Sequence, residues 1–417
     1  MQALPKVASG RGPIFLDLIM NRPDWIHRRV ETITFLAEGG TKRRISYDFT
    51  TPQDLKPFVT GGRVGIPITQ MKKVTLTNLD VTDAANASLS VWDTEDTGQM
   101  GVEVLQSAMS GFLDRSLSKS EIQRIKSIVF SKSVKGARID SLELKRILRE
   151  AKGKTPDDLT TICALVDEFA SNFIFVVEVP SEFIGSRRLL KISFDQDIGG
   201  DGRFEDGFYL GVKFQISGQY FPNAGSYHLE INAPEGLQVV NLSHSIASHG
   251  NDRWQTAESS EVVGHLGHVH VHESMIVKSR FLLELKPTYS GLFFQAFVGL
   301  TLGWFYLLLL LIGLGKVSPL LMKASEAAPL ATISLAIPAF LLTQLARSRE
   351  HSHVQRILRK PRLIASISTI ILFLSAFALV LDFSKRTFQD LLAILWLCQS
   401  ILWLFMFIYR KDLRKHQ

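Results

Sequence analysis

The chain has 417 residues, of which 46% are hydrophobic, 47 are Lys or Arg and 40 are Asp or Glu. This length favours two or three domains over one. The net charge of +7 is uneven: residues 291–417 hold 14 basic and 5 acidic side chains, and residues 1–290 hold 33 and 35. Because the basic surplus lies among apolar segments, it argues against a nucleic-acid partner for this basic protein.

Cysteine content and the N-terminal sequence bear on location. Cys163 and Cys398 are the two cysteines, one in a predicted helix and one in an apolar run, so no disulfide framework or cysteine-based zinc site is expected. This composition fits a reducing compartment. Residues 1–25 contain no apolar run of the length that a signal peptide needs. We therefore expect the soluble region to be cytosolic.

The first 173 residues predict strands followed by helices. Partial alternation of apolar and polar residues, broken by Gly, Pro and Asn, predicts a β-rich cytosolic subdomain over residues 1–99, with strands at 30–37, 42–50, 63–71 and 74–82. Apolar residues at helical spacing then predict a helical segment over residues 100–173. Ser118 and Thr155, the latter followed by Pro156, are expected to begin two of these helices.

Seven short strands are predicted next, at 173–179, 187–194, 209–217, 226–234, 237–245, 268–277 and 281–287. Their length and spacing predict an antiparallel β-sandwich-like domain over residues 174–288. The soluble region is thus expected to have an α+β fold, β-rich with a helical insert. Its last strand leads into an apolar segment almost without a linker, so we expect its orientation to be restrained.

Residues 289–417 predict an all-α bundle of four transmembrane helices. The apolar segments are 291–314, 328–345, 363–381 and 391–409, and none contains Asp, Glu, Lys or Arg. Each is near the ~20 residues that cross a bilayer. The lack of charge within them argues against an ion-coupled pump. Gly299 and Gly303 form a GxxxG pair, which either packs helices closely or is incidental.

The loop between the second and third segments sets the predicted orientation. It carries six basic residues against Glu350: Arg347, Arg349, Arg356, Arg359, Lys360 and Arg362. The C-terminal tail is also basic, and strongly basic segments stay on the cytosolic side. We therefore expect a multi-pass protein of the cell membrane with both termini cytosolic. The same six residues can also hold anionic lipid headgroups.

The most unusual local pattern is GHLGHVHVHE, in which His268, His270 and His272 alternate along one predicted strand and share a face. Imidazoles in this arrangement can bind a divalent metal, with His244, His249 and His265 as further ligands. The competing interpretation is a solvent-exposed face with histidine as its polar residue. A third is a pH sensor, since neighbouring imidazoles repel each other when charged.

Residues 194–206 (FDQDIGGDGRFED) loosely resemble a calcium-binding loop through Asp195, Asp197 and Asp201. Gly199 occupies a position that usually holds a ligand, the last ligand would be Asp206 instead of Glu, and strands flank the segment where helices would be needed. A turn between two strands, rich in Gly and Asp, explains the same residues.

Three stretches, VGIPITQMKKVTLTNLDV (64–81), SYHLEINAPEGLQVV (226–240) and FLLELKPTYSGLF (281–293), resemble uncharacterised bacterial multi-pass membrane proteins of actinobacterial type. The resemblance implies this domain order and transfers no activity or site residue.

No complete catalytic motif occurs in the sequence. We expect a non-enzymatic cytosolic binding or sensing module anchored by four transmembrane helices. Its expected partners are the lipid bilayer, a second copy through these helices, and a cytosolic protein or ligand. Two alternatives stay open. One is a membrane-bound enzyme that uses a divalent metal on the His265–His272 strand, and the other is a ligand-gated pore or effector.

Overall fold

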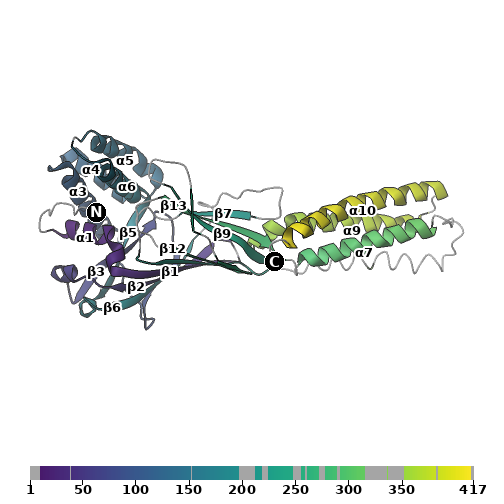
Figure 1. Ribbon diagram of the computed structural model, residues 1–417, viewed down its shortest axis with the longest axis horizontal. Coiled ribbons are helices and arrows are strands. Elements are labelled where there is room, and N and C mark those ends of the chain that lie inside the picture. Colours follow the sequence, from purple (N-terminus) through teal and green to yellow (C-terminus); the bar gives the residue numbers. More distant parts are fainter. Residues whose placement is uncertain are drawn as a thin grey trace.

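The computed structural model describes residues 10–37, 39–151, 153–196, 212–217, 224–247, 255–258, 261–271, 278–288, 292–314, 336, 352–381 and 384–414. The molecule is elongated, with short helices and several strands at one end, further strands in the middle and three long apolar helices at the other end (Figure 1). This arrangement agrees with the expected order of a β-rich region with helices followed by apolar helices.

The largest sheet has seven strands in the order β11-β12-β8-β1-β2-β6-β4. In chain order they are β1 (Ile26–Phe35), β2 (Thr41–Thr50), β4 (Thr77–Asp83), β6 (Arg187–Gln196), β8 (Tyr227–Asn232), β11 (Glu261–Val263) and β12 (Leu266–Val271). Neighbouring strands are antiparallel except β1 and β8, which run parallel with Arg29 opposite Tyr227. The sheet thus joins strands from both ends of the soluble region.

Two smaller sheets complete the β structure. A four-stranded sheet has the order β10-β9-β13-β7, and its strands are β7 (Val212–Ser217), β9 (Leu237–Ala247), β10 (Gln255–Glu258) and β13 (Lys278–Pro287). Strands β3 (Arg63–Lys72) and β5 (Asn172–Pro180) pair with each other. Two 3-10 helices, η1 (Gln53–Phe58) and η2 (Ser181–Phe183), lie near this pair in sequence.

The strand pairing differs from the expected antiparallel unit of seven strands within 173–287, and that expectation is wrong. Strand β5 pairs with β3, β6 lies between β2 and β4, and β8 runs parallel to β1. The physical reason is that alternation fixes which face of a strand is buried, whereas the partner depends on contacts between residues far apart in sequence.

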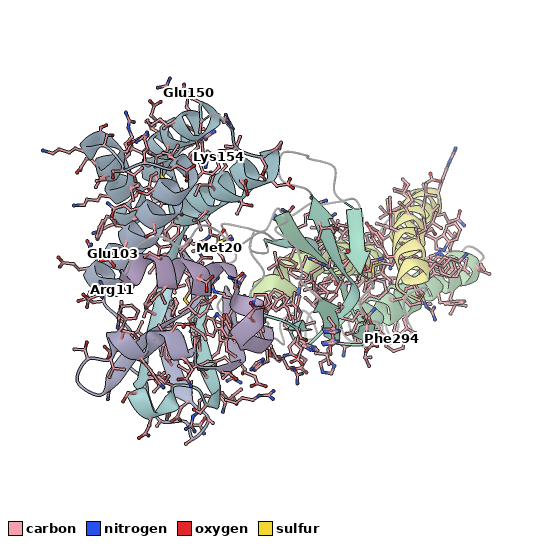
Figure 2. All side chains as sticks on the ribbon, turned by 60° about the vertical axis from the view of Figure 1, so that its left-hand side comes forward. Arg11, Met20, Glu103, Glu150, Lys154 and Phe294 are labelled. Atoms are coloured by element: carbon pink, nitrogen blue, oxygen red, sulfur yellow. The ribbon has the colours of Figure 1, made fainter. Side chains whose placement is uncertain are left out.

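Four helices lie in and just before the segment that was expected to be helical: α3 (Thr94–Leu113), α4 (Lys119–Phe130), α5 (Val134–Arg149) and α6 (Pro156–Ser171). Ser118 and Thr155 cap α4 and α6 as expected, because their hydroxyls accept hydrogen bonds from the backbone N–H groups of Glu121 and Asp158. Two helices that the sequence analysis did not predict precede β1, namely α1 (Arg11–Met20) and α2 (Arg22–Trp25). Figure 2 shows Arg11 of α1 beside Glu103 of α3, with which it forms an ion pair at 3.2 Å.

The soluble region has two hydrophobic cores. The first lies among α1, α3–α6, β2, β3 and β5 and includes Phe15, Tyr47 and Phe169. The second fills the space between the β1/β8/β12 part of the large sheet and the four-stranded sheet, and includes Ile33 and Leu283. Strands β1 and β2 are hydrogen-bonded neighbours. The buried apolar side chains of β2 belong to the first core, and Ile33 and Phe35 of β1 belong to the second. Buried polar residues lie where the two cores meet.

Three described helices are long and apolar enough to cross a membrane: α7 (Leu292–Leu314), α9 (Ser352–Val380) and α10 (Lys385–Arg414). The predicted segment 328–345 lies outside the described residues except for Ala336, so the fourth helix of the expected bundle is not confirmed. The helices pack through α7: a Cβ atom on Gly303 would lie 3.0 Å from side-chain atoms of both Gln399 and Leu372. Gly303 therefore permits close helix packing.

The sheets and the apolar helices are joined at two places. Strand β13 ends at Pro287, the backbone N–H of Thr288 donates to the carbonyl of Gly236 over 2.9 Å, and α7 begins at Leu292. Helix α9 enters the second hydrophobic core with Leu358, which is only 4% exposed. The four-stranded sheet thus precedes α7 directly in the chain and packs against α9 at Leu358.

Candidate functional site

The histidines singled out in the sequence lie on β12 or near it. His268 is half-buried and His270 exposed on one face of the strand, while Val269 and Val271 are buried on the other. His272 and His249 lie outside the described residues. His265 occupies the turn before β12 and is exposed.

His244 does not join this group. It lies on β9 in the other sheet, is 3% exposed, and its ring stacks on Phe281 with 4.8 Å between ring centroids. Neither of its ring nitrogens has a hydrogen-bond partner among the described residues. Burial lowers its pKa, which favours a neutral ring inside the core.

A histidine that the sequence analysis did not consider, His228 of β8, completes the cluster. It lies opposite His270 in the strand register, and the two rings stack with 4.4 Å between centroids. Its Nδ1 lies 3.2 Å from Nε2 of His268, and its Nε2 lies 3.0 Å from the hydroxyl oxygen of Ser226. That hydroxyl is also 3.1 Å from Nε2 of His270. The alternation of apolar and polar residues in YHLEIN (227–232) could have indicated that His228 lies on the polar face of a strand.

The contacts of the histidine cluster (His228, His268, His270 and Ser226) run as a chain and do not converge on a point. One pair of nitrogens meets between His228 and His268, and the other contacts meet at Ser226. Within the described part of the chain, no group of three or more His, Cys, Asp or Glu side chains is arranged to hold a metal ion. The site predicted from His268, His270 and His272 stays a prediction, because His272 is not described.

The surroundings of His228 disfavour its protonation. The pKa of His228 is lowered by burial first, and further by Arg28, His270 and His268, whereas Glu230 acts in the opposite direction. The contact between His228 and His268 needs at least one neutral ring, because an imidazole nitrogen accepts a hydrogen bond only when it carries no proton. The contacts with Ser226 do not need one, since the hydroxyl oxygen can itself accept. The cluster can therefore respond to acidification.

A second group of polar residues lies buried where the two hydrophobic cores meet. The carboxylate of Glu31 accepts hydrogen bonds from Arg29 at 2.7 Å, Arg43 at 3.2 Å and the hydroxyl of Tyr227 at 3.1 Å. Burial alone would raise the pKa of Glu31, but Arg29 and Arg43 hold it below its usual value. The Arg29 guanidinium also lies 5.0 Å from the centroid of the Tyr227 ring. This carboxylate is thus ionised and fully paired.

Arg22 of α2 lies in the same region and is completely buried. Its Nη1 donates to the side-chain oxygen of Gln70 over 3.3 Å, but Nε and Nη2 have no hydrogen-bond partner among the described residues. Burial lowers the pKa of Arg22 to about 10, and it lowers the pKa of nearby Lys72 to about 8. An unpaired buried donor costs about 1–3 kcal/mol, more when it is charged. Burial of Arg22 in this arrangement therefore lowers the stability of the folded state.

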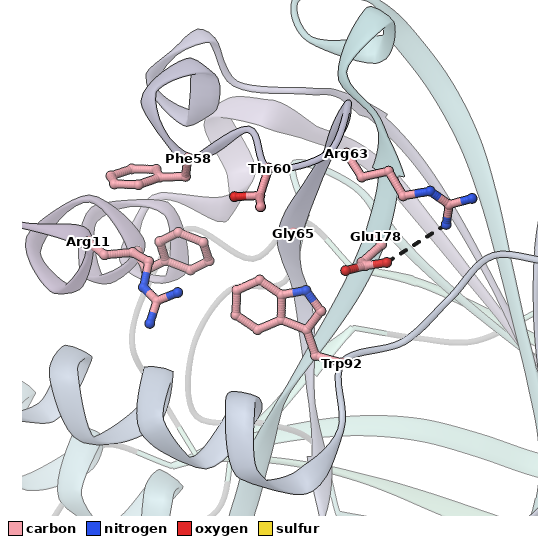
Figure 3. A pocket seen from close by; sticks show the side chains of 8 residues that line it. Arg11, Phe58, Thr60, Arg63, Gly65, Trp92 and Glu178 are labelled. Carbon is pink, nitrogen blue, oxygen red and sulfur yellow. Dashed lines mark ion pairs between the residues drawn. The ribbon is translucent and has the colours of Figure 1, made fainter.

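A small pocket lies between α1, η1 and β3 (Figure 3) and is lined by Arg11, Phe15, Phe58, Thr60, Arg63, Gly65, Trp92 and Glu178. Gly65 makes room for the indole, since a Cβ atom there would overlap the Trp92 ring. Arg63 pairs with Glu178 at 3.8 Å, and Arg11 pairs with Glu103. Each arginine of this pocket already has its carboxylate, so the pocket offers no surplus charge to a ligand.

The structure places the remaining predicted residues only in part. Arg359, Lys360 and Arg362 lie near the start of α9, Arg347 and Arg349 lie outside the described residues, and only the backbone of Arg356 is described. The last turns of α10 lie beside the first turns of α7, because the guanidinium of Arg410 lies 4.6 Å from the ring centroid of Phe297.

Asp195 belongs to β6, and its carboxylate accepts a hydrogen bond from the side chain of Asn78 over 2.6 Å. Asp197, Asp201 and Asp206, the other residues of the possible calcium loop, lie outside the described residues.

The apolar helices contain polar contacts of their own. Gln399 is completely buried and donates to the hydroxyl of Ser368 over 2.8 Å and to the carbonyl of Leu300 over 3.2 Å. The Trp304 indole donates to the Ser400 hydroxyl over 2.8 Å. Such bonds hold helices together where lipid offers no alternative partner.

No protein-family model matches the chain, and a search of curated proteins found no match.

Proposed function

We propose that this chain is a multi-pass membrane protein whose β-rich region is a non-enzymatic binding and sensing module in the cytosol. Segment 328–345 is the fourth span, and both termini are cytosolic. Support comes from the three apolar helices and from the basic residues at the sheet end of the bundle, at the start of α9 and the end of α10. Such residues favour the cytosolic side of a membrane.

The observation that carries this proposal is the shared core at Leu358. A simple anchor needs one connection to the membrane, yet here β13 leads into α7 while α9 inserts Leu358 into the same β core. Because packed cores resist continuous deformation, a change in the four-stranded sheet displaces two helices together. This arrangement is typical of a module that passes a binding event to the membrane helices.

The coupling is tested by loosening the contact. In the full-length protein in lipid nanodiscs, Leu358→Ala should increase amide hydrogen exchange in β9, β13 and the first turns of α7. The matched control is Leu363→Ala in the same helix, because Leu363 is 60% exposed. Equal exchange in wild type and Leu358→Ala would refute the coupling.

The orientation is tested separately. Ser120 is exposed on α4, so a Ser120→Cys variant that lacks the two native cysteines can be treated with a membrane-impermeant maleimide. We expect labelling only after the cells are permeabilised. Labelling in intact cells would place the β-rich region outside and overturn the cytosolic assignment.

A further inference from the structure

Ser226 lies at one end of a chain of side chains that has the arrangement of an activated nucleophile. Its hydroxyl oxygen is 3.0 Å from Nε2 of His228, and Nδ1 of His228 is 3.2 Å from Nε2 of His268. A nucleophilic hydroxyl needs a base within about 2.6–3.2 Å and a third group that orients this base. His228 and His268 occupy these two positions.

The hydrogen bond between His228 and His268 decides which nitrogen of His228 is able to act as a base. In a neutral imidazole one ring nitrogen carries the proton and the other accepts. When Nδ1 of His228 donates to Nε2 of His268, Nε2 of His228 carries no proton and faces the Ser226 hydroxyl. His228 is then the base, and His268 fixes its tautomer and its direction.

The Ser226 hydroxyl has a second imidazole neighbour, because Nε2 of His270 lies 3.1 Å away. A hydroxyl donates one hydrogen bond and can accept others. His228 is half-buried whereas His270 is exposed, and burial, followed by the charge of Arg28, lowers the pKa of His228. A neutral His228 therefore accepts the hydroxyl proton, while His270 donates to the same oxygen.

The backbone around Ser226 holds the hydroxyl in place. The N–H group of Gly225 donates to the carbonyl of Ile26 over 2.8 Å, and the carbonyl of Ser226 accepts from the N–H group of Arg29 over 2.8 Å. His228 follows two positions later, so its side chain projects from the same face of the sheet. Ser226 and His228 are only half-buried, so a small solute reaches a reacting pair that rigid elements support.

We propose that Ser226 is a covalent modification site that takes an acyl group from an activated carboxylic ester or thioester, with His228 as the base and His268 as the positioning residue. Oγ of Ser226 forms a bond to the acyl carbon while its proton moves to Nε2 of His228. The bond from the acyl carbon to the leaving oxygen or sulfur then breaks, and the leaving group takes this proton. Ser226 is left as an ester and His228 is neutral again.

The acyl donor must carry a good leaving group. The three residues assist the transfer of a proton, but they do not stabilise the negative charge that forms on the acyl oxygen during attack. The modification goes beyond the proposed function and does not depend on it, because one acyl group per chain is a single event and not turnover. It also removes the proton that Ser226 donates to His228, which changes the hydrogen bonding on this face of β8 and β12.

The test uses the full-length protein in lipid nanodiscs, with p-nitrophenyl acetate as the probe. Mass spectrometry of the digested protein should find an acetyl group on Ser226, and its increase with time gives the rate. Ser46 of β2 is the internal control, since it is half-buried on the same face of the sheet and makes no hydrogen bond to an imidazole within the described chain. Acetylation of Ser46 as fast as that of Ser226 would overturn the proposal.

Variants of the two histidines separate their roles. His228→Gln should slow acetylation of Ser226 by about 100-fold, which is within the contribution of a general base. His268→Leu should slow it by about tenfold or more, because the base is misplaced. His268→Gln should keep most of the wild-type rate, since its amide oxygen still accepts from Nδ1 of His228. Equal rates for His268→Leu, His268→Gln and wild type would refute the positioning role, and an unchanged rate in His228→Gln would refute the base.

Wild type alone keeps the test decisive if these variants do not fold. Its rate of Ser226 acetylation should increase with pH through the titration of His228, whose pKa lies below its ordinary 6.5. A rate that does not change between pH values of about 5 and 7 would overturn the proposal, because an assisting base must lose its proton first. The absence of any acetyl group on Ser226 would do the same. Neither result affects the hydrogen-exchange test of Leu358.

Discussion

Nδ1 of His228 lies 3.2 Å from Nε2 of His268, so one of these nitrogens carries a proton and the other accepts it. If both rings were protonated, two N–H groups and two positive charges would face each other at this distance. The same chain continues through Ser226 to His270. Protonation of both rings therefore removes the hydrogen bond between His228 and His268 and adds a repulsion between β8 and β12 on this face.

We predict that the protein loses stability as the pH falls from about 7 to below 6. The folded-state pKa of His228 is lowered from its ordinary 6.5, so the unfolded chain binds more protons in this window. Stability therefore rises with pH there and is lost as the pH falls below 6.5. His228→Gln should flatten the dependence of unfolding temperature on pH.

The matched control for the pH prediction is His265→Gln, because His265 is exposed in the turn before β12. This variant should keep the wild-type pH profile. His244 contributes to the same slope, since burial lowers its pKa as well, so His228→Gln removes only part of the dependence. Identical profiles for His228→Gln and wild type would contradict the prediction.

Glu31→Gln should destabilise the folded state by about 3–5 kcal/mol, because it leaves buried positive charge without its carboxylate. Glu31 is 3% exposed and pairs with both Arg29 and Arg43. Chemical denaturation of the full-length protein measures the change. Glu178→Gln breaks the more exposed pair with Arg63 and should cost less than about 1 kcal/mol. Equal costs for the two variants would contradict the assignment of a buried network.

Ser118→Ala should cost about 1 kcal/mol by removing the N-terminal cap of α4. The Ser118 hydroxyl accepts from the N–H of Glu121, and the Glu121 carboxylate accepts in return from the Ser118 N–H over 2.7 Å. Ser116→Ala, two positions before the cap and exposed, is the control and should be nearly neutral. Urea denaturation compares the two variants, and equal losses would argue against the cap.

The same carboxylate predicts an acid dependence. Hydrogen bonds from Arg115 chiefly lower the pKa of Glu121, to about 2. Its contribution to stability is therefore present above its ordinary pKa of 4.5 and is lost as the pH falls toward 2. Glu121→Gln should be destabilised at pH 6 and should differ less from wild type near pH 2. A constant difference across this range would refute the prediction.

Gly303→Leu should disrupt the packing of the apolar helices, with a cost of about 1–3 kcal/mol from overpacking. Gly313→Leu is the control on the same helix, because a Cβ atom at Gly313 has nothing within 4 Å among the described atoms. Resistance of the detergent-solubilised protein to thermal unfolding distinguishes the two. If both variants unfold alike, Gly303 is an incidental small residue.

Local signals in the sequence predicted local structure well. Ser118 and Thr155 mark the starts of α4 and α6 because a cap depends only on the next few residues. The partner of β8 could not be predicted, since parallel pairing with β1 depends on contacts across about half the chain. His228 was missed for the same reason: its neighbours His268 and His270 come from a strand that follows 40 residues later. Leu358 was assigned to no core because it lies just before a predicted apolar segment.

The parallel pairing of β1 with β8 also determines when the large sheet can close during translation. Thr32 and Glu230 are hydrogen-bonded although 198 positions separate them. At about 5–20 residues per second, the ribosome finishes β1 some 10–40 seconds before β8 exists. Throughout that interval β1 has one open edge, which is a template for pairing with the wrong chain. Soon after β8 emerges, the apolar residues of α7 follow, so closure of the sheet and delivery to the membrane compete within the same short period of translation.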